Sequence, residues 1–252
     1  MKPFLSIIIP SFNEEENFQT GALARVAEFL KKFAFSYEVL IVDDGSDDQT
    51  VNLVKGFIKD KINWQLIKNP HQGKAATIAT GVKLASGENI LFTDFDQATP
   101  LSEIEKLIPF LKKNYEIVIG SREVKGSKRE KEPFYRHLMG KGFNIIVQLF
   151  ALEGLHDTQC GFKLFKSEVA KELFKQLKVY KSELIKNAFT GAFDVEVLFL
   201  AQKKGYKIAE VPVEWRHYKT IRVNPIKDSF RMFFDVLKIK IYDILGKYEL
   251  KN

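Results

Sequence analysis

Short apolar runs alternate with longer amphipathic segments along the first 120 residues of the chain. The runs are rich in isoleucine, valine and leucine, which favours β-strands. We predict strands at residues 5–9, 37–42, 64–67, 89–93 and 116–120. Between them, apolar residues recur every three or four positions, and this spacing predicts helices that end near residues 32 and 85 and that span about 48–59 and 102–113.

The second of these runs is apolar on both faces, as is typical of a strand in a parallel sheet that helices cover on both sides. The alternation of strand and helix therefore predicts an α/β fold with a mostly parallel, doubly wound sheet. In such a sheet, ligands bind at the carboxyl ends of the strands.

The second half of the chain has a less regular pattern. We predict a charged loop at 121–133, a helix at 134–152, a short strand region at 157–165, helices at about 167–177 and 194–204, and a strand at 210–215. A basic loop at 217–224 leads into a final helix. Since we find no repeat and no flexible linker, we predict one domain over 1–215, followed by a basic loop and an amphipathic helix over 216–252.

Composition narrows the class of protein. A chain of 252 residues, 45% of them hydrophobic, can bury a substantial core. Its one cysteine, Cys160, excludes an intramolecular disulfide and fits a reducing compartment, and the first residues show no signal-peptide pattern. We therefore expect a cytoplasmic protein. The longest apolar stretch, 143–152, is interrupted by Asn144 and Gln148 and is too short to span a bilayer.

The formal charge of +7 is concentrated in two segments. Residues 122–141 carry seven Lys or Arg against three Asp or Glu, and residues 216–247 carry eight against three. Such patches suit phosphates, an anionic membrane surface or nucleic acid, although solvated loops and helix faces have the same composition. Without a nucleic-acid-binding motif or interleaved aromatic residues, we expect no nucleic acid partner.

Pairs of carboxylates follow two of the predicted strands. Asp43 and Asp44 come after the second strand, and Asp94 and Asp96 come at the end of the fourth. Because side chains alternate along a strand, Asp94 and Asp96 project to the same side, and in a parallel sheet all four point into one crevice. Two hard oxygen ligands suit Mg²⁺ or Mn²⁺ carrying a phosphorylated substrate. One such pair alone would fit an exposed turn better, but a second pair at an equivalent place argues for a site.

Several motifs of the first half resemble one enzyme family. They are IIIPSFNE at 7–14, VDDGS at 42–46, GK at 73–74, TDFD at 93–96 and GSR at 120–122. Together they resemble family 2 nucleotide-sugar glycosyltransferases of the GT-A fold. Three later motifs are similar to the polyprenyl-phosphate branch of that family, and most of all to its dolichyl-phosphate glucosyltransferases: DTQCGFKLF at 157–165, FDVE at 193–196 and EVPVEW at 210–215.

The resemblance implies donor-binding roles for the residues that match. Asp44 would accept hydrogen bonds from the base or the ribose of the nucleotide, with Asp43 supporting it. Pro10 and Glu14 would shape the base pocket. Lys74, near a helix N-terminus, would reach a phosphate, although a solvated lysine fits the same position.

The resemblance also implies a metal site. Asp96 would be the principal ligand of Mg²⁺ or Mn²⁺, and Asp94 would contact the ribose or the metal, so that the ion neutralises charge on the leaving diphosphate. Many mannosyltransferases of this branch carry Asp-x-Asp-x-Gln, whose Gln assists the metal, whereas this chain has Ala98 there. The departure favours a glucose donor over a mannose donor.

The acceptor side has its own candidates. Arg122, just past the fifth strand, suits forked phosphate binding, and Lys163 and Arg222 are weaker candidates for the same work. Asp157 matches an acidic position of the branch and would orient the acceptor, unless it only closes a turn. A lipid monophosphate is already ionised near neutral pH, so a dedicated base is optional. The expected catalytic residues are Asp96, Asp157 and Arg122.

The remaining polar candidates have simpler interpretations. The four histidines show no metal-ligand spacing, and we interpret them as incidental: His71, His137, His156 and His217. Asp194, at a predicted helix start, fits either a helix cap or a site residue.

The final helix is amphipathic. Its apolar positions follow helical spacing and are Ile226, Phe230, Phe233, Phe234, Leu237, Ile241, Ile244 and Leu245. Basic residues occupy much of the remaining arc, so the helix fits either a membrane interface or a face docked on the core. Segment 143–152 also needs cover by protein or lipid, and together with a lipid acceptor it favours the interface. We expect no N-terminal span of the kind common among dolichyl-phosphate glucosyltransferases, and therefore expect peripheral attachment to the cytoplasmic membrane face.

One main hypothesis follows: inverting, metal-dependent transfer of glucose from UDP-glucose to a polyprenyl or dolichyl phosphate. The nearest alternative uses the same acceptor with GDP-mannose or another nucleotide sugar. A non-catalytic alternative is a receiver-like or nucleotide-sensing α/β module that binds Mg²⁺, although a receiver would end near residue 125. The chain lacks the membrane spans and the Gln-x-x-Arg-Trp motif of a processive polysaccharide synthase. The sequence leaves the oligomeric state open, a homo-oligomer included.

Overall fold

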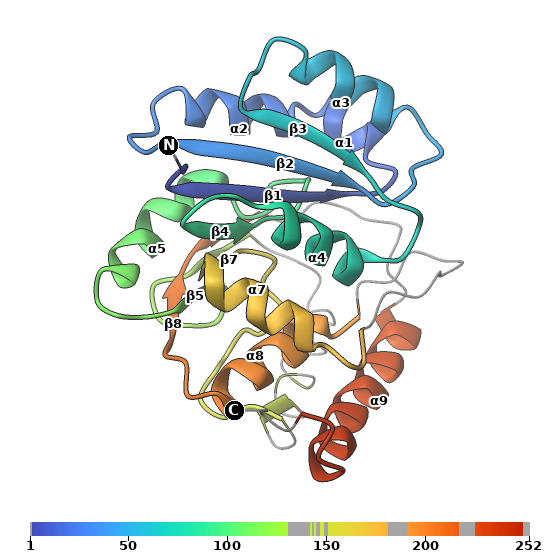
Figure 1. Ribbon diagram of the computed structural model, residues 1–252, viewed down its shortest axis with the longest axis vertical. Coiled ribbons are helices and arrows are strands. Elements are labelled where there is room, and N and C mark those ends of the chain that lie inside the picture. The colour runs from blue at the N-terminus through green and yellow to red at the C-terminus, as the bar shows by residue number, and fades with distance from the viewer. Residues whose placement is uncertain are drawn as a thin grey trace.

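The computed structural model describes residues 2–130, 142, 144, 147, 148, 151–180, 191–216 and 225–248, with only the backbone described at 225–229. Its centre is a seven-stranded sheet of order β3-β2-β1-β4-β7-β5-β8 (Figure 1). The strands are β1 (Leu5–Ser11), β2 (Tyr37–Asp43), β3 (Trp64–Lys68), β4 (Asn89–Phe92), β5 (Ile117–Ser121), β7 (Lys163–Lys166) and β8 (Ile208–Pro212). A separate ribbon pairs β6 (Lys128–Arg129) with β9 (Glu214–Trp215).

Among the described strands, β7 alone runs against its neighbours. It lies antiparallel between β4 and β5, whereas the other pairs in the sheet are parallel. The predicted α/β fold with a mostly parallel sheet is therefore confirmed. Two predicted strands differ in detail, because the region 157–165 becomes a strand only at Lys163 and the run 210–215 divides into β8 and β9.

Strand β1 continues through Pro10, where the sequence pattern predicted its end. Pro10 pairs with Val42 of β2, while the pairing of β1 with β4 ends at Ile8. Proline has no backbone N–H to donate. It is tolerated in a strand at a position where no neighbouring strand needs that hydrogen bond. The extension lets β1 and β2 finish level, at Ser11 and Asp43.

Helices cover both faces of the sheet. The helices are α1 (Glu15–Gln19), α2 (Ala22–Leu30), α3 (Thr50–Ile58), α4 (Lys74–Leu84), α5 (Ile104–Leu111), α7 (Ser167–Gln176), α8 (Phe193–Lys203) and α9 (Pro225–Ile244). Ile7 and Ile9 of β1 pack in one buried cluster with α2, α3 and α5, and Ile8 packs in the other with α4, α7 and α8. The alternation of buried side chains on a strand thus builds two cores.

The predicted helix ending near residue 32 is in fact two helices, α1 and α2. Gly21 lies between them with φ of 79°, in the left-handed region that glycine adopts without strain. The break lets α1 contact α3, while α2 packs into the core through Leu23, Val26 and Leu30.

Helix α9 packs against α8 at the lower right of Figure 1. Val236 and Ile239 are buried in the same core as α8, whereas most of the described side chains of the predicted apolar stripe are exposed. The stripe contributes five exposed side chains: Phe230, Phe234, Ile241, Ile244 and Leu245.

In the parts of the chain that the structure describes, no helix is both long and apolar enough to cross a membrane. The predicted helix 134–152 falls largely outside the described residues, as do the loop 217–224 and Arg222.

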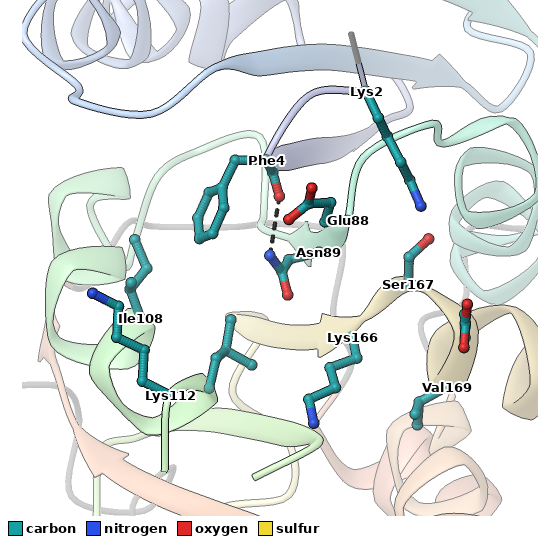
Figure 2. Close-up of a pocket in the computed structure, with 11 residues that line it drawn as sticks. Lys2, Phe4, Glu88, Asn89, Ile108, Lys112, Lys166, Ser167 and Val169 are labelled. Atoms are coloured by element: carbon teal, nitrogen blue, oxygen red, sulfur yellow. Dashed lines mark hydrogen bonds between the residues drawn. The ribbon is translucent and has the colours of Figure 1, made fainter. Parts of the chain in front are cut away.

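A hollow of about 470 Å³ opens at the amino-terminal edge of the sheet (Figure 2). It lies where β1 and β4 begin and β7 ends, and Lys2, Lys112 and Lys166 line it beside Phe4 and Asn89. The predicted acidic residues lie at the opposite, carboxyl edge of the parallel strands, so this hollow is separate from them.

Candidate active site

Asp43 organises the turn that follows β2. Its carboxylate accepts hydrogen bonds from the backbone N–H groups of Gly45 and Ser46, both at 3.1 Å, and from Ser46 Oγ at 2.5 Å. The side chain is buried. Because its oxygens are used within the turn, Asp43 fixes the loop that carries Asp44.

Asp44 binds the loop that follows β3. One carboxylate oxygen accepts the backbone N–H of Gln72 at 2.9 Å, and the other accepts that of Gly73 at 2.8 Å and lies 2.8 Å from His71 Nδ1. The His71 ring stacks on Phe12, with ring centroids 4.3 Å apart. These contacts join the loops after β1, β2 and β3 at one edge of the sheet.

Asp94 and Asp96 follow β4 on either side of the buried Phe95. Asp96 Oδ1 accepts the Ala98 backbone N–H at 2.9 Å, and Asp94 Oδ1 lies 2.5 Å from Nζ of Lys74, the first residue of α4. Both carboxylates are partly exposed, so a ligand can reach them.

Gly161 makes room for Asp94. A Cβ atom at this position would lie 2.0 Å from Asp94 Oδ2, which is closer than atoms can approach. Only glycine, which has no side chain, lets the backbone come so near the carboxylate. The loop before β7 therefore reaches the carboxylates at the end of β4.

The electrostatic balance of this cluster favours a cation. Burial raises the pKa of Asp96 to about 6, and the negative charges of Asp94 and Glu14 act in the same direction. Burial opposes the charged form of Lys74, but the negative charges of Asp94, Asp194 and Asp96 raise the pKa of this lysine. A positive ion beside Asp96 would relieve the repulsion between the carboxylates.

The donor set fits a divalent cation that is shared with a substrate. Within the described ranges, no cluster of three or more His, Cys, Asp or Glu side chains is arranged to hold a metal. One or two carboxylates are nevertheless the usual protein contribution where Mg²⁺ also binds substrate phosphates. Asp94 and Asp96 would hold such an ion together with the oxygens of a diphosphate.

Arg122 and Asp157 form an ion pair beyond β5, in which Asp157 is buried and Arg122 is partly exposed. Arg122 Nε lies 2.7 Å from one Asp157 oxygen and Nη2 lies 2.8 Å from the other, and the guanidinium covers the Trp215 ring at 5.6 Å from its centroid. Burial disfavours the Asp157 carboxylate, but the charge and hydrogen bonds of Arg122 outweigh this effect and lower its pKa. Asp157 is therefore ionised at neutral pH.

Sequence comparison decides the family. The family model described as Glycosyl transferase family 2 matches residues 6–174, which is more than half of the chain. The chain belongs to glycosyltransferase family 2. The resemblance stated from the motifs is thus confirmed, and a non-catalytic receiver-like module is replaced by an enzyme of this family.

Nearly the whole of this family 2 glycosyltransferase aligns with relatives that are longer than it is. It is 35% identical over 262 residues to the dolichyl-phosphate beta-glucosyltransferase of Dictyostelium discoideum. That alignment covers 99% of this chain and 77% of the relative. It is 33% identical over 264 residues to the Homo sapiens dolichyl-phosphate beta-glucosyltransferase, with coverage of 98% and 78%.

A solved structure shares the fold of this glycosyltransferase. Glucosyl-3-phosphoglycerate synthase from Mycobacterium tuberculosis, in complex with Mn²⁺, uridine diphosphate and glucosyl-3-phosphoglycerate, aligns with a TM-score of 0.59 and 15% identity. The alignment covers 99% of this chain and 81% of that chain. The seven-stranded, mostly parallel sheet is of the GT-A type, as predicted.

The structure corrects the expectation for Lys163. Its side chain is wholly buried, with Nζ 2.6 Å from Asp194 Oδ1 and hydrogen-bonded to the Cys160 carbonyl. An ammonium enclosed in this way is paired with Asp194 and does not face a lipid phosphate. Asp194 is not a cap either, because the N-cap of α8 is Ala192. Arg222 lies outside the described residues, and its role stays a prediction.

The other predicted site residues divide into two groups. Glu14, Lys74 and Asp94 lie close enough to Asp96 for their charges to act on it. The prediction that Asp43 and Asp44 share one crevice with Asp94 and Asp96 stays a prediction. Arg122 and Asp157, assigned separately from the sequence, instead bind each other, so a phosphate at Arg122 would compete with Asp157. Pro10 pairs with Val42 near the end of β1, and Asp44 turns toward His71. The donor-binding roles predicted from the resemblance stay predictions for all five residues: Pro10, Glu14, Asp43, Asp44 and Lys74.

Sequence reasoning missed His71, which it treated as incidental. The ring contacts Asp44 and Phe12, and its Nε2 atom is buried without a hydrogen-bond partner among the described residues. The available signal was position, because His71 follows the third strand and therefore lies at the same carboxyl edge as the acidic pairs. His156 bonds Glu210, and the other two histidines, His137 and His217, lie outside the described residues.

Proposed function

We propose that this enzyme transfers glucose from UDP-glucose to dolichyl phosphate or another polyprenyl phosphate, with inversion and with a divalent metal. The observation that carries the proposal is the pair Asp94 and Asp96 at the carboxyl end of β4, beside Lys74. Relatives that align with nearly the whole chain are dolichyl-phosphate beta-glucosyltransferases. A neighbour of the same fold in complex with Mn²⁺ and uridine diphosphate supports the uridine donor and the metal.

The reaction breaks the bond between glucose C1 and the diphosphate oxygen of the donor, and it forms a bond between C1 and an acceptor phosphate oxygen. The departing UDP keeps the electron pair. The charge that builds on this leaving group would be neutralised by Mg²⁺ or Mn²⁺ if Asp94 and Asp96 hold the ion. Asp94 and Asp96 hold the donor end, and no side chain needs to take a proton, because a lipid monophosphate is already ionised near neutral pH.

The acceptor would approach from the side of β5. Strands β4 and β5 both run antiparallel to the β7 strand between them, so their carboxyl ends lie at the same edge of the sheet. The pair Arg122 and Asp157 follows β5 at this edge. The planar guanidinium is held by Asp157 and Trp215 and is partly exposed, so an acceptor phosphate would bind its N–H groups in competition with Asp157.

Transfer of radiolabelled sugar tests the proposal. Purified enzyme is incubated with polyprenyl phosphate, a panel of UDP- and GDP-sugars, and Mn²⁺, Mg²⁺ or chelator. We expect lipid-linked product with UDP-glucose and metal, and a loss of at least about 100-fold in Asp96→Asn because a metal ligand is removed. Asp60→Asn is the matched control, because it makes the same change at an exposed carboxylate that follows α3 and not β4.

The outcomes separate the parts of the proposal. Lipid-linked product with GDP-mannose alone would change the donor. If the chelator does not lower the amount of product, the reaction does not depend on a metal. If folded protein makes no lipid-linked product with any donor, the proposal as a whole is overturned.

We also propose that α9 attaches the enzyme peripherally to the cytoplasmic face of a membrane. Its outward face is apolar, with Phe230, Phe234 and Ile244 each more than half exposed. Arg231, Lys238 and Lys240 are exposed on the same helix, and helical spacing places them along the borders of the apolar face. An apolar face with basic borders fits an anionic lipid surface, which also supplies the acceptor.

A further inference from the structure

A row of alternating charges leads inward from Asp94. Lys74 Nζ lies 2.5 Å from Asp94, and Lys163 Nζ lies 2.6 Å from Asp194. Exposure falls along the row: the side chains of Asp94 and Lys74 are 36% and 21% exposed, whereas those of Asp194 and Lys163 are 3% and 0% exposed. The outer pair is therefore within reach of a ligand, and the inner pair is fixed in the core.

Lys74 is under the influence of both carboxylates. Burial opposes its charged form, but the negative charges of Asp94 and then Asp194 raise its pKa. Burial also raises the pKa of Asp194, and the charges of Lys163 and Lys74 only partly offset this effect. Asp194 is thus an incompletely compensated carboxylate that would gain from a closer approach of Lys74.

Two cations cannot share Asp94 without strong mutual repulsion. A divalent ion at Asp94 and Asp96 would therefore displace the Lys74 ammonium, whose flexible four-carbon stem allows it to move while its backbone stays at the start of α4. We propose that Lys74 is an exchangeable counter-ion, which neutralises Asp94 in the ligand-free enzyme and passes to Asp194 when the metal binds. This inference rests on the proposed metal site.

The exchange has a measurable consequence for metal affinity. Lys74 competes with the divalent ion for Asp94, so its removal should strengthen metal binding. Asp194 receives the displaced ammonium, so its neutralisation should weaken metal binding, but only while Lys74 is present. A merely structural role for Asp194 would make the same change in either background.

Binding of Mn²⁺ alone, followed by the paramagnetic resonance signal of the free ion, tests the competition. We expect Lys74→Met to bind Mn²⁺ about tenfold more tightly than the natural enzyme, since an opposing charge within ion-pair distance is lost. Methionine keeps the length of the stem and supplies no oxygen ligand. Lys83→Met removes an exposed lysine from the same helix and should leave the affinity unchanged.

The receiving role is tested with Lys163→Gln/Asp194→Asn, which leaves no unpaired charge in the core. It should weaken Mn²⁺ binding in the presence of Lys74 and have no effect in the Lys74→Met background. An equal effect in both backgrounds would overturn the receiving role, and unchanged or weaker Mn²⁺ binding by Lys74→Met would overturn the exchange by itself. If the natural enzyme binds no Mn²⁺, the proposed metal site fails as well, whereas failure of the exchange alone leaves it standing.

Discussion

Two buried carboxylates at the carboxyl edge of the sheet are each stabilised by a partner from a distant segment. Asp157 binds Arg122 across 35 positions of sequence, and Asp194 binds Lys163 across 31. Replacing one member leaves the other charge buried and unpaired, which destabilises a protein more than the intact pair stabilises it. Substitutions at single residues here therefore report the cost of an isolated charge.

Asp157→Asn should destabilise the fold by about 2 kcal/mol at neutral pH, because the Arg122 guanidinium, only partly exposed, would lose its carboxylate. The pKa of Asp157 is lowered from 3.8 in the folded state, so the stabilisation from its ionised form is present above that value and is lost as the pH falls below it. The difference in free energy of unfolding between the natural enzyme and Asp157→Asn should thus shrink at about pH 3.5 and below. Urea unfolding at each pH measures it.

Asp60→Asn is the control, since it alters an exposed carboxylate and should change the free energy of unfolding by less than about 0.5 kcal/mol. A difference for Asp157→Asn that stays constant down to acid pH would contradict the role of the ionised pair.

At the scale of elements, α9 has one apolar face that is buried and another that is exposed. Val236 and Ile239 bury one face against the core, and the other face, with Phe230 and Phe234, is exposed. A helix that is needed only for packing keeps polar residues on its outer face. The second face of α9 is therefore accounted for by a partner outside the described structure, for which we propose lipid.

The double variant Phe230→Ser/Phe234→Ser should lose membrane binding. Each phenylalanine contributes about 1.5–3 kcal/mol when it leaves water, so the affinity for vesicles should fall at least about tenfold. Flotation with neutral and with partly anionic vesicles measures it, and the anionic vesicles should bind the natural enzyme better. Ile62→Ser/Leu84→Ser, which removes exposed apolar side chains elsewhere, should float like the natural enzyme.

Size-exclusion chromatography of the same proteins tests whether the outer face of α9 binds a second copy of the enzyme. If the natural enzyme is a dimer that the phenylalanine variant converts to a monomer, while flotation is unchanged, the outer face of α9 binds a second copy instead of lipid.

On the scale of the whole molecule, donor binding should stabilise the fold. Loops after β1, β2, β3 and β4 meet at one edge, held by contacts such as Asp44 with Gly73 and Lys74 with Asp94. A ligand bound across them favours the folded state by mass action. At saturation, UDP with Mn²⁺ should raise the melting temperature by about 5 °C.

Differential scanning fluorimetry measures this shift. Chelator or Asp96→Asn should remove most of it, because the diphosphate would then face the carboxylates without a metal between them. An equal shift with UDP in chelator would show that the nucleotide binds independently of the metal.

The sequence predicted the elements of this molecule much better than the contacts between them. Strands β1–β5 lie within two residues of their predicted places, because the apolar runs that define them are local. The acidic residues at strand ends were found because parallel topology places such ends together. The partners were not found: Lys163 with Asp194 and Asp44 with His71 depend on which loops cross at the edge. The antiparallel position of β7 depends on strand order, which no local pattern encodes.

The position of β7 determines the order in which the sheet can form. Strand β5 pairs with β7 and β8 and with none of β1–β4, so the sheet cannot be completed in the order of the chain. During synthesis, β1–β4 emerge first, and β4 presents an open edge until residues 163–166 leave the ribosome. Because this pairing is between distant segments, it forms late and slowly. A nascent chain stalled before Lys163 would expose the edge of β4 beside Asp94, where strands of other nascent chains can add.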